Sequence, residues 1–170
     1  MNQPTLETKR LTLKPRGLSD LKAAVAINSD PRVLTHLGTP WPEERMWTHL
    51  AAQMLRNYGV GLGYWSIFSR EAPNDLLGWT GLIPLGDGLE TQLAYRLKVS
   101  AWGQGIATEA ARQVMRHGSD VLQLPFVAAW VHPDNLASQG VLAKLRFERN
   151  GTYGDPPQLL YRCTRETSTC

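Results

Sequence analysis

Two glycines in the segment Tyr95–Ala111, with the sequence YRLKVSAWGQGIATEAA, offer the first chemistry in this chain. A strand is expected to run into a loop that contains Gly103 and Gly105, and a helix is expected directly after them. The first amides of a helix lack intrahelical acceptors and carry the positive end of its dipole. Because glycine lets a ligand approach the backbone without meeting a Cβ, this pattern predicts an anion site suited to a pyrophosphate. Taken alone, the glycine pair also fits a simple helix-entry turn.

Two other nucleotide-binding patterns do not fit this loop. A P-loop needs Gly-Lys-Ser/Thr after its second glycine, and Ile106, Ala107 and Thr108 do not supply it. A dinucleotide fingerprint needs a third small residue near Thr108 and an acidic residue at a strand end about 20 positions later. Asp120 has this spacing but falls within the expected helix.

Polar residues at the start of a later helix form a second candidate group. Asn135 and Ser138 are three positions apart, so their side chains lie on one side of that helix, one turn apart. If the strand Phe126–Val131 lies beside the strand Thr91–Val99, that side faces the glycine loop. The alternative is local, because Asp134 or Asn135 could cap the helix and leave Ser138 as a surface hydroxyl. We assign the cap to Asp134 and a functional role to the other two.

The strands that position these groups follow from alternating apolar residues and turn signals. Asn74-Asp75 and Gly86-Asp87-Gly88 predict turns of an antiparallel meander, and Gly78 and Gly81 indicate a bulge in its middle strand. The expected strands are Leu11–Pro15, Tyr64–Ser69, Leu76–Leu85, Thr91–Val99, Phe126–Val131, Thr152–Tyr153 and Leu159–Thr164.

Helices are expected between these strands, where apolar residues recur at helical spacing. The first runs from a cap at Ser19-Asp20 to Asn28, and a brief helical turn passes through Val33 and Leu34. The others run from Pro42 to Tyr58, from Gly105 to Val121, and from Pro133-Asp134 to Leu145. The order β-α-α-β-β-β-α-β-α-β-β predicts an α/β fold, with a mixed, mostly antiparallel sheet flanked by helices, as one domain over residues 1–170.

Composition limits the class of protein. With 42% apolar and 19% charged residues and no apolar run near the length of a membrane span, the chain reads as a cytoplasmic protein. The first 15 residues lack the apolar stretch of a secretory signal. Two cysteines and four histidines make neither a disulfide framework nor a metal-ligand spacing. The net charge of +3 favours an anionic small molecule and shows no nucleic-acid footprint.

The chain resembles the GNAT superfamily of acetyl-CoA-dependent N-acetyltransferases, and most closely the branch of bacterial ribosomal-protein N-terminal alanine and serine acetyltransferases. The resemblance covers nearly the whole chain. It is strongest in TKRLTLKP at Thr8–Pro15, WGQGIATEA at Trp102–Ala110, and the motifs HPDNLAS and VLAKLRF within His132–Phe147.

The resemblance implies a site for acetyl-CoA and no metal. The diphosphate would be held by backbone amides, and the pantetheine would pair with the end of the preceding strand, where one N–H would also hold the thioester oxygen. Asn135 would contact the cofactor, and Ser138 would lie near its sulfur. The implied binding residues are Leu97, Lys98, Val99, Gly103, Gln104, Gly105, Ile106, Ala107, Thr108, Asn135 and Ser138.

The implied reaction is direct transfer of the acetyl group to a primary amine, with Ser138 assisting the thiolate and a general base taking the amine proton. Relatives often carry a carboxylate where this chain has Gln92. Glu90, two residues earlier on the same strand face, is our candidate base, with a water chain, His36 or His132 as alternatives. Glu109 is expected to be structural.

The acceptor end is expected between His36 and Trp47, where His36 and Trp41 would contact the amine substrate. Trp47 is expected to pack beneath the cofactor helix. Arg146 replaces the glycine that relatives carry at a helix end, so it must either adopt a strained conformation or end the helix differently.

The acceptor, a protein N-terminus or a small molecule, stays open, as does the oligomeric state, a homodimer included. No nucleic-acid or membrane partner is expected. A non-catalytic acyl-CoA-binding module or sensor is the alternative function, because Gln92 replaces the carboxylate. A nicotinamide oxidoreductase would require stabilisation by NAD and not by coenzyme A.

Overall fold

A computed structural model describes residues 3–38, 41–85 and 90–164. Its strands form one eight-stranded sheet in the order β1-β2-β3-β4-β5-β6-β8-β7. The strands are β1 (Leu6–Glu7), β2 (Leu11–Pro15), β3 (Gly63–Ser69), β4 (Leu76–Leu85), β5 (Glu90–Leu97), β6 (Phe126–Val131), β7 (Glu148–Tyr153) and β8 (Gln158–Thr164). The predicted α/β fold with a mostly antiparallel sheet is confirmed.

Five α-helices accompany the sheet within the described residues. They are α1 (Leu21–Asn28), α2 (Pro31–Leu34), α3 (Glu43–Leu55), α4 (Ile106–Arg116) and α5 (Leu136–Lys144). Short 3-10 turns occur at η1 (Leu18–Asp20) and η2 (Val99–Ala101), and α4 continues into a π-helical turn, η3 (His117–Val121).

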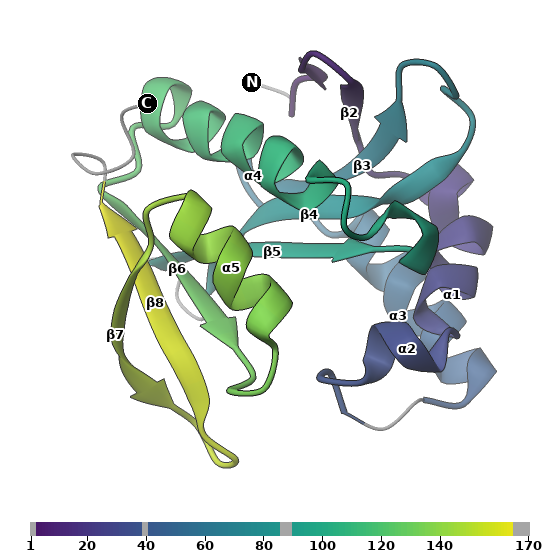
Figure 1. Ribbon diagram of the computed structural model, residues 1–170. Helices are drawn as coiled ribbons and strands as arrows, with labels where there is room; N and C mark the ends of the chain where they lie inside the picture. Colours follow the sequence, from purple (N-terminus) through teal and green to yellow (C-terminus); the bar gives the residue numbers. More distant parts are fainter. Residues whose placement is uncertain (1–2, 39–40, 86–89, 165–170) are drawn as a thin grey trace.

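Strands β5 and β6 meet at one end only. They are the parallel pair of the sheet, and their register contains the single pair Gln92–Ala128. Beyond that point β6 stays paired with β8 over its whole length, and β5 stays paired with β4. Figure 1 shows the two strands diverging, with α4 and α5 on one side of the opening. The sheet is therefore split where β5 runs toward the glycine loop.

Alternation along the strands divides the core between the two faces of the sheet. The larger cluster packs α4 against inward residues such as Leu13, Trp65 and Leu93. The smaller cluster packs α1 and α3 against Phe68 and Trp79. On β5, Leu93, Tyr95 and Leu97 therefore face α4, and the residues between them face α1 and α3.

A bulge lies in β4 at the predicted position. Ile67 pairs with Gly78, but the next pair is Phe68 with Leu76, so one extra residue sits in β4. Gly78 has φ +149°, and a Cβ there would overlap the carbonyl oxygen of Arg96 and lie 2.7 Å from Leu97 Cα. Gly81, also flagged by the sequence, lies in regular register. The bulge thus fixes the end of β5 that precedes the glycine loop.

Several element ends differ from the expectation. Helix α3 ends at Leu55 and not at Tyr58, because Arg56 is extended and the chain turns away. The buried face of α4 does not extend to Val121, which lies on the exposed side of η3. Strand β1 was not predicted, since two residues carry no readable alternation. The expected Gly86–Gly88 turn lies outside the described residues.

Arg146 adopts a left-handed conformation, of the kind that favours glycine. Its φ is 62°, and the amide of Phe147 donates back to the carbonyl of Leu142 at 3.0 Å. Of the two possibilities stated for this position, the chain accepts the strained conformation and keeps the usual helix end.

Candidate active site

The glycine loop presents open backbone at the start of α4. Gly103 and Gly105 have φ of 73° and 75°, in the left-handed region. A Cβ on Gly103 would meet nothing within 4 Å, and one on Gly105 would meet only Arg10 Nη2, at 3.6 Å. The space over this backbone is therefore free for a ligand.

The first amides of α4 precede its hydrogen-bond ladder. The first bond of the helix runs from Glu109 N to Gly105 O, at 3.0 Å, and no side chain caps the helix. The N–H groups of Ile106, Ala107 and Thr108 therefore have no intrahelical acceptor. Ile106 buries its side chain in the main core, which anchors the helix start. These amides and the helix dipole together suit a phosphate oxygen.

Glu109 ties the glycine loop to the start of β2. Its Oε1 accepts from Thr8 Oγ1 at 2.6 Å and from the Arg10 amide at 3.1 Å, and its Oε2 pairs with Arg10 Nη2 at 2.6 Å. Arg10 Nη1 donates to Gln104 O at 3.0 Å, and Gln104 Nε2 donates to Ser100 O at 2.7 Å. The expectation that Glu109 is structural is confirmed, and the TKRL motif supplies its partners.

Glu109→Gln is expected to lower the free energy of unfolding by about 1 kcal/mol at pH 7, since Arg10 is half exposed and its ion pair is screened. Burial alone would raise the pKa of Glu109, but hydrogen bonds from Thr8 and Arg10 outweigh it and hold that pKa below its usual value. A depressed pKa stabilises the fold above the unfolded pKa, and this contribution is lost as pH falls through the folded pKa. Urea unfolding at pH 7 and at about pH 3.5 should show the parent–variant difference shrinking in acid. A difference that stays constant between the two pH values would contradict this role.

The edge of β5 that faces the split is open beyond Gln92. Lys98 N donates to Leu77 O on β4 at 2.9 Å, so by alternation the amides of Tyr95 and Leu97 point away from β4, toward the split. Lys98 and Val99 were expected to pair with a ligand there; the structure corrects this for the Lys98 amide, and for Val99 it stays a prediction. The strand ends at Leu97, the Lys98 amide is occupied by β4, and Val99 begins η2.

Helix α5 supplies the opposite wall of the split. Asn135, not Asp134, is its N-cap, because Asn135 Oδ1 accepts from Ser138 N at 3.1 Å whereas the Asp134 amide donates to His132 Nδ1. Tyr95 Oη donates to Ser138 O at 3.2 Å, which joins β5 to α5 across the opening. Burial raises the pKa of Tyr95 to about 12, so its hydroxyl stays protonated.

Tyr95 was missed as a site residue. The sequence did hold a signal for it: Tyr95 alternates with Leu93 and Leu97 on the last strand of the expected meander, so its side chain had to face α4 with theirs. The structure brings Tyr95, Asn135 and Ser138 to the two walls of one opening, with the glycine loop at its end.

Glu90 lies at the closed end of the split. Its Oε1 accepts from Arg162 Nη2 at 2.8 Å, and it stands five residues before Tyr95, roughly 16 Å along an extended strand. The shared strand face with Gln92 holds, but the distance and the ion pair do not favour Glu90 as the general base.

Two histidines lie at the open end. His36 and His132 stack with ring centroids 5.4 Å apart. Because Gln92 pairs with Ala128 and the strands run parallel, His132 is level with Arg96 at the mouth of the split. His132 Nδ1 accepts from the Asp134 amide, whereas His36 lies on the segment after α2, toward the acceptor side.

Both tryptophans of the expected acceptor region, Trp41 and Trp47, lie at or in α3. Trp41 packs edge-on against His49, with centroids 4.6 Å apart, and lies under the Arg45 guanidinium at 4.5 Å. Trp47 packs against the α1 and α3 cluster and donates to Glu43, so the expectation that it packs beneath α4 is wrong. Its residue type predicted burial but could not show which face of the sheet α3 covers.

In the part of the chain that the structure describes, no helix is long and apolar enough to cross a bilayer. The same residues contain no group of three or more His, Cys, Asp or Glu side chains placed to hold a metal ion.

Comparison with known proteins gives one consistent result. The family described as Acetyltransferase (GNAT) domain matches residues 10–148. FsC-acetyl coenzyme A-N(2)-transacetylase of Aspergillus fumigatus is 29% identical over 189 residues, covering 96% of this chain and 77% of that protein. The crystal structure of an acetyltransferase from Agrobacterium tumefaciens str. C58 has a TM-score of 0.83 at 27% identity, covering 96% and 95% of the two chains.

A further solved structure shares the fold at low identity. It is the RimL ribosomal L7/L12 alpha-N-protein acetyltransferase in complex with coenzyme A, with a TM-score of 0.78 at 17% identity and coverage of 96% and 99%.

Proposed function

This chain belongs to the GNAT acetyltransferase family, and from that membership we propose that it transfers an acetyl group from acetyl-CoA directly to a primary amine. It is an acetyl-CoA-dependent acyltransferase, and the relatives it matches include proteins named as N-acetyltransferases. The observation that carries the proposal is the split between β5 and β6, which ends at an open glycine loop. We take residues 1–170 as one such domain.

The cosubstrate would lie along the split. The amides between Gly103 and Thr108 would bind its diphosphate, and the exposed edge at Tyr95 and Leu97 would pair with the pantetheine amides as an added strand. This fit rests on the free space over Gly103 and Gly105 and on the unpaired edge of β5. Asn135 and Ser138 would line the other wall.

The transfer step needs few protein groups. The neutral amine forms a C–N bond with the thioester carbonyl, the C–S bond breaks, and coenzyme A leaves as the thiolate. An edge N–H of β5 would hold the carbonyl oxygen as charge develops on it. Tyr95 Oη or Ser138 Oγ would protonate the thiolate, and His36, or water beside it, would take the proton that the amine releases.

The proposal requires that the acceptor be a primary amine. A protein N-terminal amine and a small-molecule amine both fit an opening at the mouth of the split, between the segment after α2 and the start of α5. A cheap experiment separates catalysis from binding alone: thiol release from acetyl-CoA is measured across a panel of amines and peptides. Release with at least one amine supports the proposal. Stabilisation by coenzyme A without release from any amine would favour the acyl-CoA-binding alternative that Gln92 suggests.

Tyr95→Phe is expected to lower kcat by roughly 100-fold, because a positioned proton donor contributes about 100- to 10,000-fold to such reactions. Its affinity for coenzyme A should change little, since the aromatic ring and the backbone edge remain. Ser138→Ala is expected to act in the same direction. Tyr153→Phe is the matched control, because Tyr153 lies exposed on β7, away from the split. Unchanged kcat in both site variants would remove these hydroxyls from the mechanism.

A further inference from the structure

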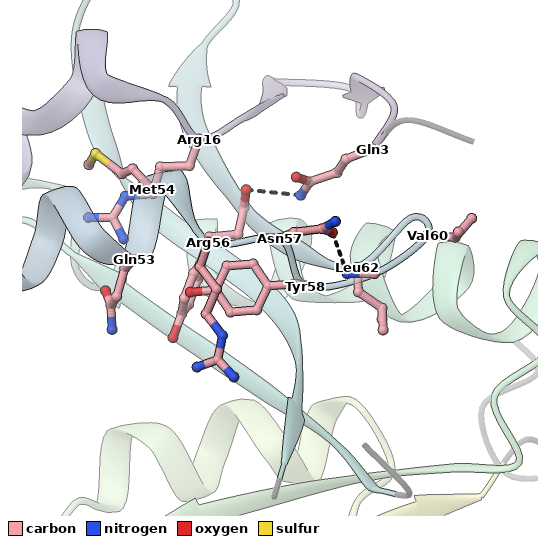
Figure 2. Close-up of a pocket in the computed structure, with 11 residues that line it drawn as sticks. Gln3, Arg16, Gln53, Met54, Arg56, Asn57, Tyr58, Val60 and Leu62 are labelled. Atoms are coloured by element: carbon pink, nitrogen blue, oxygen red, sulfur yellow. Dashed lines mark hydrogen bonds between the residues drawn. The ribbon is translucent and has the colours of Figure 1, made fainter. Parts of the chain in front are cut away.

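A cavity of about 430 Å³ lies between the end of α3 and the start of β3, apart from the cosubstrate split. Its walls include Gln3, Arg16, Gln53, Arg56, Tyr58 and Tyr64. Figure 2 shows Arg16, Gln53 and Met54 along one part of the wall, and Arg56 with Tyr58 along another. None of these residues belongs to the loop or the split described above.

Arg16 is a buried cation without a hydrogen-bonding partner in the described part of the chain. Arg16 is only 7% exposed, and none of its three guanidinium nitrogens has a hydrogen-bond partner among the described residues. It stacks on Trp79, with 4.0 Å from its Cζ to the ring centroid. Burial lowers the pKa of Arg16 to about 10, so the side chain is still charged at neutral pH. A guanidinium offers five N–H donors and no acceptor, so only an acceptor group in the cavity can satisfy it.

The surroundings of Arg16 are positive. Arg96 lies over the same Trp79 ring, at 5.7 Å, and Arg56 in the cavity wall stacks on Tyr58, at 5.2 Å. Burial lowers the pKa of His49 on α3, and the charges of Arg45, Arg96 and Arg16 lower it further. These groups all favour a negative charge between α3 and the sheet.

The nearby carboxylate does not neutralise this charge. Asp20 attracts Arg16 only from a distance, and its Oδ2 accepts from Ser66 Oγ at 2.7 Å and from Gly17 N at 3.2 Å. No ion pair of Arg16 is found among the described residues, whereas Arg10, Arg32, Lys98 and Arg162 each have one. The cavity therefore keeps a donor-rich, cationic wall.

The cavity lies on the face of the sheet that α1 and α3 cover, opposite α4. The α4 face of β5 is filled by the main core and the glycine loop. On the opposite face, the register line Tyr64–Gly81–Ala94 joins the cavity wall to β5 across two strand spacings, roughly 10 Å. Ala94 directly precedes Tyr95, at the edge where the thioester is proposed to lie.

We propose that this cavity binds a carboxylate of the amine acceptor, held by Arg16 with support from Arg56. The proposal rests on the proposed N-acetyltransferase function and names its substrate class: amines whose carboxylate stands about 10 Å from the attacking nitrogen. Planar guanidinium and carboxylate groups match in a bidentate pair. An α-amino acid is too short to reach both points, whereas an extended amino-carboxylate, or a peptide N-terminus followed closely by an acidic side chain, is long enough.

The test compares acceptors of matched length. Rates of thiol release are measured with glycine, aminohexanoate and aminooctanoate, with the primary amides of the two longer acids, and with the phosphonate analogue of aminooctanoate. In the parent we expect kcat/KM for aminooctanoate to exceed that for its amide by at least about tenfold, mostly through KM. Arg16→Gln should remove this preference and leave the amide's kcat/KM within about twofold. Lys14→Gln, two residues before Arg16 and outside the cavity, is the matched control and should keep this preference.

A binding measurement keeps the proposal testable without turnover. Aminooctanoate alone should raise the melting temperature of the parent and of Lys14→Gln, but not of Arg16→Gln. If no amine is acetylated, the proposed function fails. The shift in melting temperature still tests whether the cavity binds a carboxylate. An equal preference in Arg16→Gln, or no shift that depends on Arg16, would overturn the proposal. Stronger selection of the phosphonate than of the carboxylate would overturn the choice of carboxylate. Arg16→Gln should itself melt no lower than the parent, because it removes an unpaired buried charge.

Discussion

Gly105→Leu is expected to weaken the binding of coenzyme A by about 100-fold or more, which corresponds to about 2.7 kcal/mol. The proposed diphosphate site is made of backbone amides, and hydrogen bonds to a charged oxygen are worth about 1.5–3 kcal/mol each. A side chain at Gly105 would stand in the space that the ligand must occupy. That space is open, since a Cβ placed there would meet only Arg10 Nη2, at 3.6 Å. Isothermal titration with coenzyme A measures the change directly.

The control for this variant must share its backbone strain. Leucine at φ +75° costs about 1–2 kcal/mol of stability, because a left-handed backbone disfavours a side chain. Gly151 on β7 has φ +121° and open space around it, so Gly151→Leu carries at least as much backbone strain away from the loop. We expect Gly151→Leu to be destabilised and to bind coenzyme A as the parent does. Equal losses of affinity in the two variants would show that strain, and not access to the amides, explains the effect.

Gly78→Ala is expected to lower the free energy of unfolding by about 3–5 kcal/mol, the largest stability effect of any single change considered for this chain. The new Cβ would overlap the Arg96 carbonyl oxygen, and both neighbours are backbone of β5, which cannot rotate away. The left-handed φ of +149° adds conformational cost. Urea unfolding, with parent and variant compared at the same pH, gives the value.

Gly140→Ala supplies the contrast for that measurement. Gly140 lies within α5, and a Cβ there would meet nothing within 4 Å. Alanine should stabilise the helix by about 0.5–1 kcal/mol, since glycine loses more backbone freedom on folding. If Gly78→Ala lowers the free energy of unfolding by less than about 1 kcal/mol, β5 must shift to accommodate the new side chain. The claim that the bulge fixes the end of β5 would then be wrong.

The features that the sequence predicted well are those encoded locally. Gly103 and Gly105 predicted a turn that leads directly into a helix, and the structure has both there. The bulge at Gly78 is a local signal of the same kind. Strand Phe126–Val131 was predicted with its observed ends, because an apolar run between turn residues is readable without its neighbours.

The features that were missed depend on contacts between distant parts of the chain. The partners of Glu109 lie about a hundred positions away, at Thr8 and Arg10, so only its structural role could be guessed. Glu90 shares a strand face with Gln92, as expected, but its ion pair with Arg162 depends on the register of β6 with β8. The cationic cavity around Arg16 was not predicted, because its wall joins the residue after β2, the start of β3 and the end of α3.

Small differences in where elements begin and end changed other assignments. The end of β5 falls at Leu97, two residues earlier than expected, and its open edge includes the amides of Tyr95 and Leu97. The cap of α5 falls one residue later, at Asn135. Because amides alternate along a strand, the Lys98 amide points to β4 whereas the amide of its neighbour Leu97 points to the split.

Amide hydrogen exchange with and without coenzyme A tests the central claim most directly. If the ligand's diphosphate rests on the start of α4 and its pantetheine pairs with the open edge of β5, exchange should slow at Ile106, Ala107 and Thr108 and at Tyr95 and Leu97. The Lys98 amide, already bonded to Leu77, should change little. Saturating coenzyme A that leaves exchange at these five amides unaltered, while other amides become protected, would contradict the account.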